Sequence, residues 1–457
     1  MSHFRLINRK TDYLLPPSLD DWLPEDHLAR FILEAIEQLD LSALILRYGG
    51  RGSAAYHPEV LLSLLVYGYA TGTFSSRKIE RATYDSIAFR YLAAGSHPDH
   101  DTLANFRRRF LDELADIFLQ VLELAGEMKL LKLGTISLDG TKLHANASRH
   151  SALSYAHIQA LENQLKTEVQ ELLTLAESAD QAETPVGMDL PDEIKRRQDR
   201  LLAMAAAKAK IEARARVRFE QDQALYQEKL ARRAARMAKT GKKLGGTLPN
   251  APVEGPTPHD QINLTDEDSR IMRIPGGAFE QYYNAQAAVD ADTLLIVAQG
   301  LTQAGNDIQQ VAPMLVELKA LPASLGKVQV LLGDCGYNSD SNIAACEAAE
   351  IEPYLAVARQ DHHPGWRSRF AQPPALDANA TAQQRMAHKL KTEPGRSLYA
   401  LRKQTVEPVF GIIKSVMGFR QFLLRGKDTV SGEWRLVCMA WNLKRMAVMR
   451  HKSVQGR

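Results

Sequence analysis

The chain has 457 residues, of which 45% are hydrophobic. That is enough to bury several cores without disulfide bonds, which excludes a disulfide-stapled mini-protein, a disordered chain and a fibre. The formal net charge is only +3, but residues 195–243 carry sixteen Lys and Arg against five acids, and residues 396–457 carry thirteen against three. An acidic run, residues 161–193, offsets them with nine acids against one base. Two basic segments indicate a polyanionic partner, although a solvated surface helix explains the first equally well.

Residues 1–130 are predicted to form a helical domain. One helix runs through LARFILEAIEQL, and a later one, LANFRRRFLDELADIFLQVLELAGEM, is continuous. An amphipathic helix between them, SRKIERATYD, carries Arg77, Lys78 and Arg81 on its polar side. The residues expected to start or stop these helices are Pro58, Gly72, Ser75 or Ser76, and Asp101 or Thr102. Short polar helices around a glycine turn resemble a helix-turn-helix DNA-binding unit, although an ordinary helical bundle gives the same pattern more often.

Strand patterns begin at GTISLDG and are then interrupted. Residues 151–243 are rich in Ala, Glu, Gln, Leu, Lys and Arg, which predicts two long helices in a hairpin or arm. Strands return at YYNAQAAVDADTLLIVAQGL, with a turn at Asp290-Ala291-Asp292, and at VQVLLGD and EPYLAVA. The predicted order is two strands, a helical insertion, two strands, then α-β-α-β and terminal helices, with a loop over residues 361–394. This is a mixed α+β core interrupted by an arm.

Three acidic residues have positions suited to phosphodiester chemistry. Asp139 and Asp334 are each predicted to end an apolar strand, where side chains project into the crevice beyond a sheet. Glu407 precedes Pro408, which predicts a helix start or kink at that point. Lys414 lies nearly two helical turns further on, on roughly the same face, where it can meet a phosphate. Hard Mg²⁺ ions take oxygen ligands, and two of them clamp the attacking and leaving oxygens of a phosphodiester. Taken alone, each Asp before or near a glycine is more often a turn residue.

Ordered sequence blocks connect these acids to a known family. The chain resembles bacterial insertion-sequence transposases that have a DDE catalytic core of ribonuclease H-like fold. Tyr399, Arg402, Glu407 and Lys414 resemble the Tyr-Arg-Glu-Lys signature of this group, although Lys403, not Arg402, has the usual spacing to the glutamate. The blocks that carry the resemblance are LPEDHLARFI, HPEVLLSLLVYGYATGTFSSRKIE, HDTLANFRRRF, SLDGTKLHANAS, YYNAQAAVD, IVAQGLTQAGND, LLGDCGYNSD and TVEPVFGIIKSVMGFRQFLLRG.

The resemblance implies a domain organisation and a mechanism. It implies a helical N-terminal DNA-binding domain (1–130), a first catalytic segment (131–150), a helical insertion arm and loop (151–260), and the remaining catalytic core with terminal helices (261–457). Asp139, Asp334 and Glu407 would hold two Mg²⁺ ions, with Mn²⁺ as a substitute. Cleavage of the inverted-repeat ends and transfer of their 3′-hydroxyls to target DNA would follow, on a homodimer that holds double-stranded DNA. The expected DNA contacts are Lys142, Asn146, Tyr399, Arg402, Lys403, Lys414, Arg77, Lys78 and Arg81.

Other features limit the alternatives. The cysteines form no CxxC pair, so neither zinc nor secretion is indicated. The N-terminus has no apolar run, and the longest uncharged stretch, residues 60–76, is short of the roughly 20 apolar residues of a membrane span. We therefore expect a soluble, cytoplasmic, nucleoid-associated protein. HPDHD is expected to supply caps and turns, and Trp434 and Trp441 to form a core stripe. A ribonuclease H-like nuclease without strand transfer and a non-catalytic DNA-binding regulator remain alternatives.

Overall fold

The chain divides into two compact units, which are described separately. Unit 1 combines Met1–Asn146 with Tyr282–Arg457, and unit 2 is Ala147–Gln281. Because unit 2 interrupts unit 1 in sequence, unit 1 is discontinuous. The finer boundaries after residues 130, 150 and 260 stay a prediction. The computed structural model describes residues 18–48, 55–111, 113–177, 189–241, 247–273, 277–358, 373, 375–377 and 379–455.

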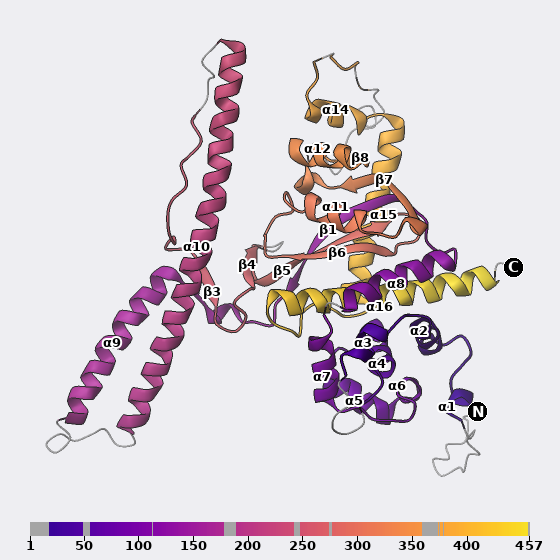
Figure 1. The fold of residues 1–457 in the computed structure, drawn as a ribbon, viewed down its shortest axis with the longest axis horizontal. Coiled ribbons are helices and arrows are strands. Elements are labelled where there is room, and N and C mark those ends of the chain that lie inside the picture. Colours follow the sequence, from indigo (N-terminus) through magenta and orange to yellow (C-terminus); the bar gives the residue numbers. More distant parts are fainter. Residues whose placement is uncertain are drawn as a thin grey trace, which may run out of the picture. The chain divides into compact units, whose positions relative to one another are not determined.

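The N-terminal part of unit 1 is helical, as predicted (Figure 1). Pro58 begins α4, and Gly72 ends it with a left-handed φ of 86°, a conformation that glycine adopts without steric cost. Ser75 is the N-cap residue of α5, but its side chain makes no capping hydrogen bond. The helices are α1 (Leu19–Trp22), α2 (Leu28–Glu37), α3 (Ser42–Leu46), α4 (Pro58–Thr71), α5 (Ser76–Asp85), α6 (Ile87–Leu92), α7 (His100–Arg109) and α8 (Glu113–Glu127).

Two predictions about the end of this region are wrong. The cap of α7 is Asp99, not Asp101 or Thr102, because its Oδ1 accepts a hydrogen bond from the Thr102 N–H at 2.8 Å. The predicted continuous helix is also divided into α7 and α8. Phe110 lies at the break with non-helical dihedrals (φ −112°, ψ 40°), and its ring is buried. Tertiary packing of this ring therefore outweighs the local helix propensity.

A mixed sheet forms the centre of unit 1, with strand order β5-β1-β7-β8 and with β6 also paired to β5. β1 is antiparallel to β5 and parallel to β7. β7 is also parallel to β8, and β5 is antiparallel to β6. The two strands predicted before the insertion are one long strand, β1. The strands are β1 (Leu133–His144), β5 (Phe279–Asp290), β6 (Ile296–Thr302), β7 (Gly326–Gly333) and β8 (Glu352–Leu355). A further strand, β4 (Arg270–Arg273), lies within unit 2.

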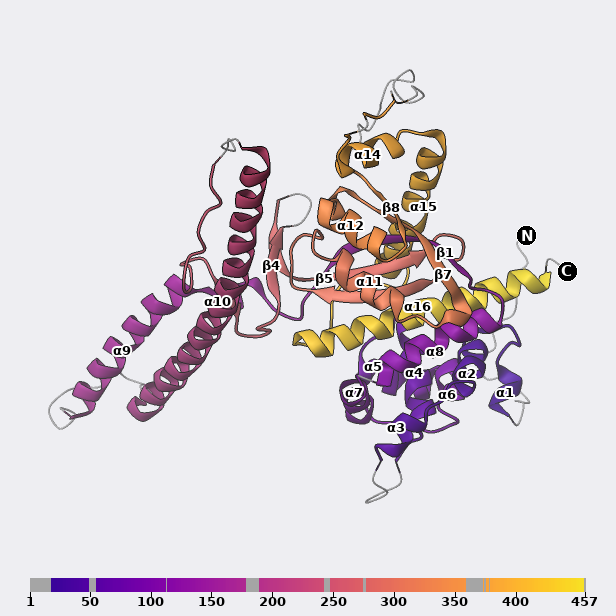
Figure 2. The ribbon, with the colours of Figure 1, turned by 45° about the horizontal axis from the view of Figure 1, so that its top comes forward.

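Further helices complete unit 1, and α8 lies along α16 (Figures 1 and 2). The core stripe is confirmed, because Trp434 and Trp441 are buried and donate indole hydrogen bonds to the carbonyls of Gln286 at 3.0 Å and Leu294 at 2.9 Å. These helices are α11 (Val311–Lys319), α12 (Asp340–Ala348), α14 (Ala382–Lys389), α15 (Glu393–Ser415) and α16 (Lys427–Gln455), with short 3₁₀ turns η1 (Arg149–Ser151, in unit 2), η2 (Ala323–Leu325) and η3 (Cys335–Tyr337).

Helix α14 corrects the prediction of a loop over residues 361–394. It begins with a capping box, in which the side chains of Thr381 and Gln384 each bond the other's backbone. That Thr-x-x-Gln pattern is a helix signal, which the Pro and Ala content of the segment obscured. Residues 361–372 of the same prediction lie outside the described residues.

Unit 2 is the helical arm that the composition predicts. α9 (Tyr155–Glu177) packs against α10 (Leu190–Thr240). The predicted break at Leu190-Pro191 is the start of α10, whereas the one at Thr184-Pro185 lies outside the described residues. A small antiparallel pair, β2 (Ala152–Ser154) with β3 (Gln261–Asn263), was not predicted. The shared core of the arm is Ile158, Leu165, Met204, Ala207, Ile211 and Ile262.

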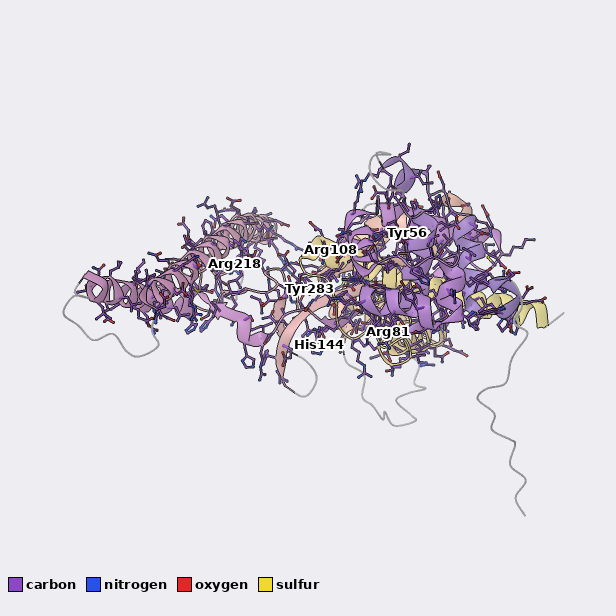
Figure 3. All side chains as sticks on the ribbon, turned by 90° about the horizontal axis from the view of Figure 1, so that it is seen from below. Tyr56, Arg81, Arg108, His144, Arg218 and Tyr283 are labelled. Carbon is purple, nitrogen blue, oxygen red and sulfur yellow. The ribbon has the colours of Figure 1, made fainter. Side chains whose placement is uncertain are left out.

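Ion pairs within unit 2 balance part of the basic run 195–243. They join cations of α10 to acids on α9 and to acids in the segment that follows α10 within unit 2. One of these cations, Arg218, is labelled in Figure 3. The positive charge of α10 is therefore only partly available to an external anion. The pairs are Arg197 with Glu168 at 2.7 Å, Lys208 with Glu162 at 2.9 Å, Lys210 with Glu267 at 2.6 Å and Arg218 with Asp260 at 2.7 Å.

Candidate active site

Asp139 and Asp334 lie beside each other at the point where two parallel strands separate. The pairing of β1 with β7 ends at Leu138 opposite Gly333, and the next residue of each segment is an aspartate. Asp334 follows the end of β7, as predicted. Asp139 does not end its strand, because β1 continues to His144 through its pairing with β5. The site is therefore set by the end of the parallel pairing rather than by the end of β1.

The electrostatics of Asp139 reflect this proximity. Burial, followed by the negative charge of Asp334, raises the pKa of Asp139 to about 7. A hydrogen bond from the Gly140 N–H to Asp139 Oδ1, at 2.8 Å, acts in the opposite direction. Without a cation, the Asp139 carboxyl at neutral pH is therefore divided between its protonated and ionised forms. A bound cation would favour the ionised form.

A tight turn fixes the orientation of Asp334. Its carboxylate accepts a hydrogen bond from the Gly336 N–H at 2.8 Å and caps the 3₁₀ turn η3. A β-carbon on Gly336 would lie only 3.0 Å from Asp334 Oδ1. Tyr337, the last residue of the turn, is buried and donates a hydrogen bond to Gln286 Oε1. Gly336 and Tyr337 therefore shape the turn.

Glu407 lies inside helix α15, not at its start. The helix continues through Pro408, although a proline cannot donate the usual backbone hydrogen bond. Val406, Val409 and Phe410 are buried beside it, and this packing holds the helical path where local sequence disfavours it. The Glu407 side chain is 48% exposed.

Arg402 connects Glu407 to the strand carboxylates. Its Nη2 donates to Glu407 Oε1 at 2.9 Å, and its Nη1 lies 3.5 Å from Asp139 Oδ2. The guanidinium is also 5.9 Å from the centre of the Tyr399 ring. Lys403 is exposed. Between the two cations that the sequence left open, Arg402 is the one placed among the carboxylates.

Lys414 reaches the same strand from the end of α15. Its Nζ donates to the backbone carbonyl of Lys142 at 3.1 Å. Burial lowers the pKa of Lys414, and the charge of Asp139 partly opposes this shift. Lys414 is therefore a half-buried cation whose field acts on Asp139.

Asp307, which lies between β6 and α11, was not singled out from the sequence. Its Oδ1 accepts hydrogen bonds from Asn284 Nδ2 and Gln286 Nε2, each at 2.7 Å. A β-carbon on Gly140 would lie 2.6 Å from this same oxygen, so Gly140 permits the close approach of Asp307 to β1. The block IVAQGLTQAGND ends at Asp307, and this acid after a strand was the available signal.

The donor set fits a divalent cation. Asp139, Asp334, Asp307 and Glu407 supply hard carboxylate oxygens. Arg402 pairs with Asp139 and Glu407, and Lys414 acts on Asp139 through its charge. The side chains thus carry more negative than positive charge, which a divalent cation would offset. In the described part of the chain, however, no three His, Cys, Asp or Glu side chains are close enough to form a metal site as they stand. The Arg402 guanidinium lies between Asp139 and Glu407 and acts there as the stand-in cation.

The other predicted DNA contacts lie on separate elements. Asn146 Nδ2 donates to the Leu423 carbonyl at 2.7 Å. Arg81 of α5, which Figure 3 labels, pairs with Asp85 at 3.1 Å. Arg77, Lys78 and Arg81 are exposed, and no hydrogen bond or ion pair found in the described residues joins them to the carboxylates. Arg77, Lys78 and Arg81 therefore form an exposed basic face on α5, apart from the carboxylates.

Two family models match the chain. Residues 17–109 match a model described as a transposase domain (DUF772), and residues 373–447 match one described as a transposase DDE domain. These two matches support an insertion-sequence DDE transposase. The mixed sheet and its helices are the α+β, ribonuclease H-like class expected of the transposase. No curated protein and no solved structure gives a significant match.

The matched regions cover only part of the site. The DDE match includes Arg402, Glu407 and Lys414, whereas Asp139 and Asp334 lie outside both matches. DNA is the substrate that a transposase implies. None of the helices in the described ranges combines the length and apolar composition of a membrane span.

Proposed function

We propose that the transposase cleaves the inverted-repeat ends of its insertion sequence by metal-dependent hydrolysis and joins the freed 3′-hydroxyls to target DNA. The observation that carries this proposal is the convergence of three carboxylates from distant parts of the chain. Asp139 and Asp334 stand side by side, and Arg402 links Asp139 to Glu407. When bound, Mg²⁺ ions lower the pKa of water and stabilise charge on the attacking and leaving oxygens.

The residues of the chain have distinct parts in this proposal. Asp139, Asp334 and Glu407 would hold the cations, and burial of Asp139 would strengthen its interaction with them. Arg402, whose guanidinium already lies beside Asp139 and Glu407, would contact a phosphate of the bound strand. Lys414, anchored on the Lys142 carbonyl, adds positive charge beside β1. Tyr399 positions the Arg402 side chain through its ring.

A strand-transfer assay separates this function from its alternatives. Pre-cleaved transposon ends, supercoiled plasmid and Mg²⁺ are incubated with the full chain, and joined products are resolved on a gel. We expect joined products from both one and two ends. Nicking without joining would support the nuclease alternative, and binding without either reaction would support the non-catalytic regulator. Light scattering of the protein on paired ends tests the proposed homodimer, for which two subunits are expected.

Substitution of Arg402 and Lys403 tests which cation serves the site. Arg402→Gln is expected to reduce end cleavage about 100-fold, because a charge placed at the reacting phosphate is lost. Lys403→Gln is the matched control, since it removes a neighbouring charge that is exposed, and we expect less than about a threefold effect. Single-turnover cleavage rates at saturating protein make the comparison. Equal losses in the two variants would contradict the placement of Arg402.

The basic face of α5 is proposed to bind DNA phosphates. The triple variant Arg77→Gln, Lys78→Gln, Arg81→Gln is expected to weaken binding and to lower the slope of log affinity against log salt by about one per lost contact. Fluorescence anisotropy with transposon-end DNA at several salt concentrations measures that slope. Lys319→Gln on α11, also exposed, is the control and should leave the slope unchanged. An unaltered salt slope in the triple variant would show that this face of α5 does not contact DNA phosphates.

A further inference from the structure

A pocket of about 380 Å³ lies in unit 1, where the last turn of α7 approaches the start of α16. Two arginines line it: Arg108 of α7, which Figure 3 labels, and Arg425, which comes two residues before α16. All of the lining residues belong to unit 1, so the pocket is a feature of that unit alone. The other lining residues are Asn146, Leu423, Leu424 and Thr429.

No acid neutralises either arginine in the described part of the chain. Arg108 is exposed and takes part in no hydrogen bond or ion pair found there. The Arg425 side chain donates from Nε to the carbonyl of Asn146 at 3.0 Å, and no bond to its two Nη groups is found among the same residues. Asp428, in the first turn of α16, is exposed and does not line the pocket. Two uncompensated guanidinium groups therefore line one small space.

A buried hydrogen-bond network fixes the two sides of this pocket relative to each other. Arg107, the residue before Arg108, donates to the Tyr69 hydroxyl at 2.7 Å, and Tyr69 donates to Glu433 Oε1 at 2.6 Å. Glu433 Oε2 accepts the backbone N–H groups of both leucines that line the pocket, each at 2.9 Å. Connected buried hydrogen bonds of this kind hold their partners rigidly. The backbone positions of the two arginines are therefore set before a ligand arrives, which lowers the cost of ordering them on binding.

We propose that the pocket binds one backbone phosphate of the transposon-end DNA through the guanidinium groups of Arg108 and Arg425. A guanidinium matches phosphate geometry, because it can donate two parallel charge-assisted hydrogen bonds to two oxygens. Two such groups more than offset the single negative charge of a phosphodiester. The inference rests on the proposed function and extends it, since it assigns a DNA contact that is separate from the carboxylates and from α5.

The place of the pocket in the chain limits where this phosphate can lie on the DNA. Asn146, at the pocket, follows Asp139 by seven positions, so the Cα atoms of these two residues are at most about 25 Å apart. One DNA strand advances about 3.4 Å per nucleotide along the duplex axis. We therefore expect the bound phosphate to lie within about ten nucleotides of the bond cleaved beside Asp139.

Ethylation interference on transposon-end DNA locates this phosphate. DNA with randomly ethylated phosphates is mixed with the full chain, and the phosphates whose ethylation prevents binding are mapped from the bound fraction. Arg108→Gln and Arg425→Gln are each expected to lose interference at the same phosphate and to keep it elsewhere. For unmodified DNA, affinity should fall about tenfold, and the slope of log affinity against log salt should become smaller by about one.

Further variants test whether the two arginines serve one phosphate. The double variant Arg108→Gln, Arg425→Gln should lower the salt slope by about one rather than two, because a single phosphate is released. Arg108→Lys keeps the positive charge and should retain the salt slope. Arg90→Gln is the matched control, since Arg90 is an exposed arginine of α6 that lies outside the pocket. The Tm of Arg108→Gln should stay close to that of the unsubstituted chain, because Arg108 holds no partner among the described residues.

The interference maps also distinguish the ways in which this proposal can fail. A complete interference pattern in Arg108→Gln would overturn it, and so would losses at two separate phosphates in the two single variants. An equal change in Arg90→Gln would show that the effect is one of net charge and not of the pocket. If ethylation of no phosphate reduces binding by the unsubstituted chain, the proposed DNA function itself fails, and not this pocket alone.

Discussion

Asp139→Asn, Asp334→Asn and Glu407→Gln are each expected to reduce cleavage of transposon ends by about 1000-fold or more. Each substitution keeps the side-chain volume and removes one charged oxygen ligand, which costs several kcal/mol of transition-state stabilisation. DNA binding should persist, because the lost charges are negative and repel the phosphates. Gel-based cleavage and anisotropy on the same preparations separate the two effects. Asp292→Asn, at an exposed turn position, is the control and should cleave normally.

The Asp139 variant should differ from the others in its stability. The pKa of Asp139 in the folded chain is about 7, well above its usual value of 3.8, because burial and Asp334 disfavour the charge. The stability that this group contributes is therefore lost as the pH rises through about 7. Without metal, Asp139→Asn should gain Tm relative to the unsubstituted protein between pH 5 and pH 8. A catalytic defect accompanied by a lower Tm at pH 8 would instead indicate a misfolded variant and remove the support for a metal-holding role.

The candidate site was predictable where short-range sequence decides the geometry. Asp334 follows an apolar strand and caps a Gly-containing turn, and both features can be recognised from a few residues. Asp139 was identified correctly as a candidate but placed at a strand end, because the antiparallel partner β5 that prolongs β1 comes after the arm in sequence. Asp307 was missed for a related reason. Its orientation depends on Asn284 and Gln286, and no local pattern indicates that these amides meet it.

The fold shows the same contrast between features set by short-range sequence and features set by distant segments. Pro58, Gly72 and the long helices of the arm follow from propensity and end signals, which act within a few residues. The break at Phe110 and the uninterrupted path of α15 through Pro408 depend on which side chains are buried. Packing energy is set by tertiary neighbours, so a single sequence predicts the presence of these helices better than their continuity.

Glu433→Gln is expected to destabilise unit 1 by about 3–5 kcal/mol, because it breaks a buried charge pair. The Glu433 side chain is fully buried and accepts a hydrogen bond from the Tyr69 hydroxyl at 2.6 Å. Its other oxygen accepts the backbone N–H groups of Leu423 and Leu424, each at 2.9 Å. Arg107, 6% exposed, lies 3.8 Å away. The variant would leave the Arg107 charge buried without compensation. Its amide NH₂ group would also face either the Tyr69 hydroxyl or the backbone N–H groups of Leu423 and Leu424, which are donors themselves.

Urea unfolding followed by tryptophan fluorescence measures this effect, with an apparent Tm roughly 10 °C lower as a second readout. Glu34→Gln is the matched control, since Glu34 forms an exposed pair with Arg450 at 2.7 Å, and exposed pairs contribute no more than about 1 kcal/mol. Tyr69→Phe removes a single hydrogen bond, and its loss of unfolding free energy should lie between those of Glu433→Gln and Glu34→Gln. Similar losses for Glu433→Gln and Glu34→Gln would mean that the buried charge contributes little to stability.

The position of Glu433 also links the N-terminal helices to the strand that carries Asp139. The backbone that it holds, Leu423 and Leu424, follows Phe422, whose N–H donates to the carbonyl of His144 at the end of β1 at 2.9 Å. Tyr69 and Arg107 belong to α4 and α7. At temperatures where Glu433→Gln remains folded, cleavage should therefore fall further than DNA binding by α5. Equal losses of cleavage and binding would indicate that the N-terminal helices and β1 are not coupled through this glutamate.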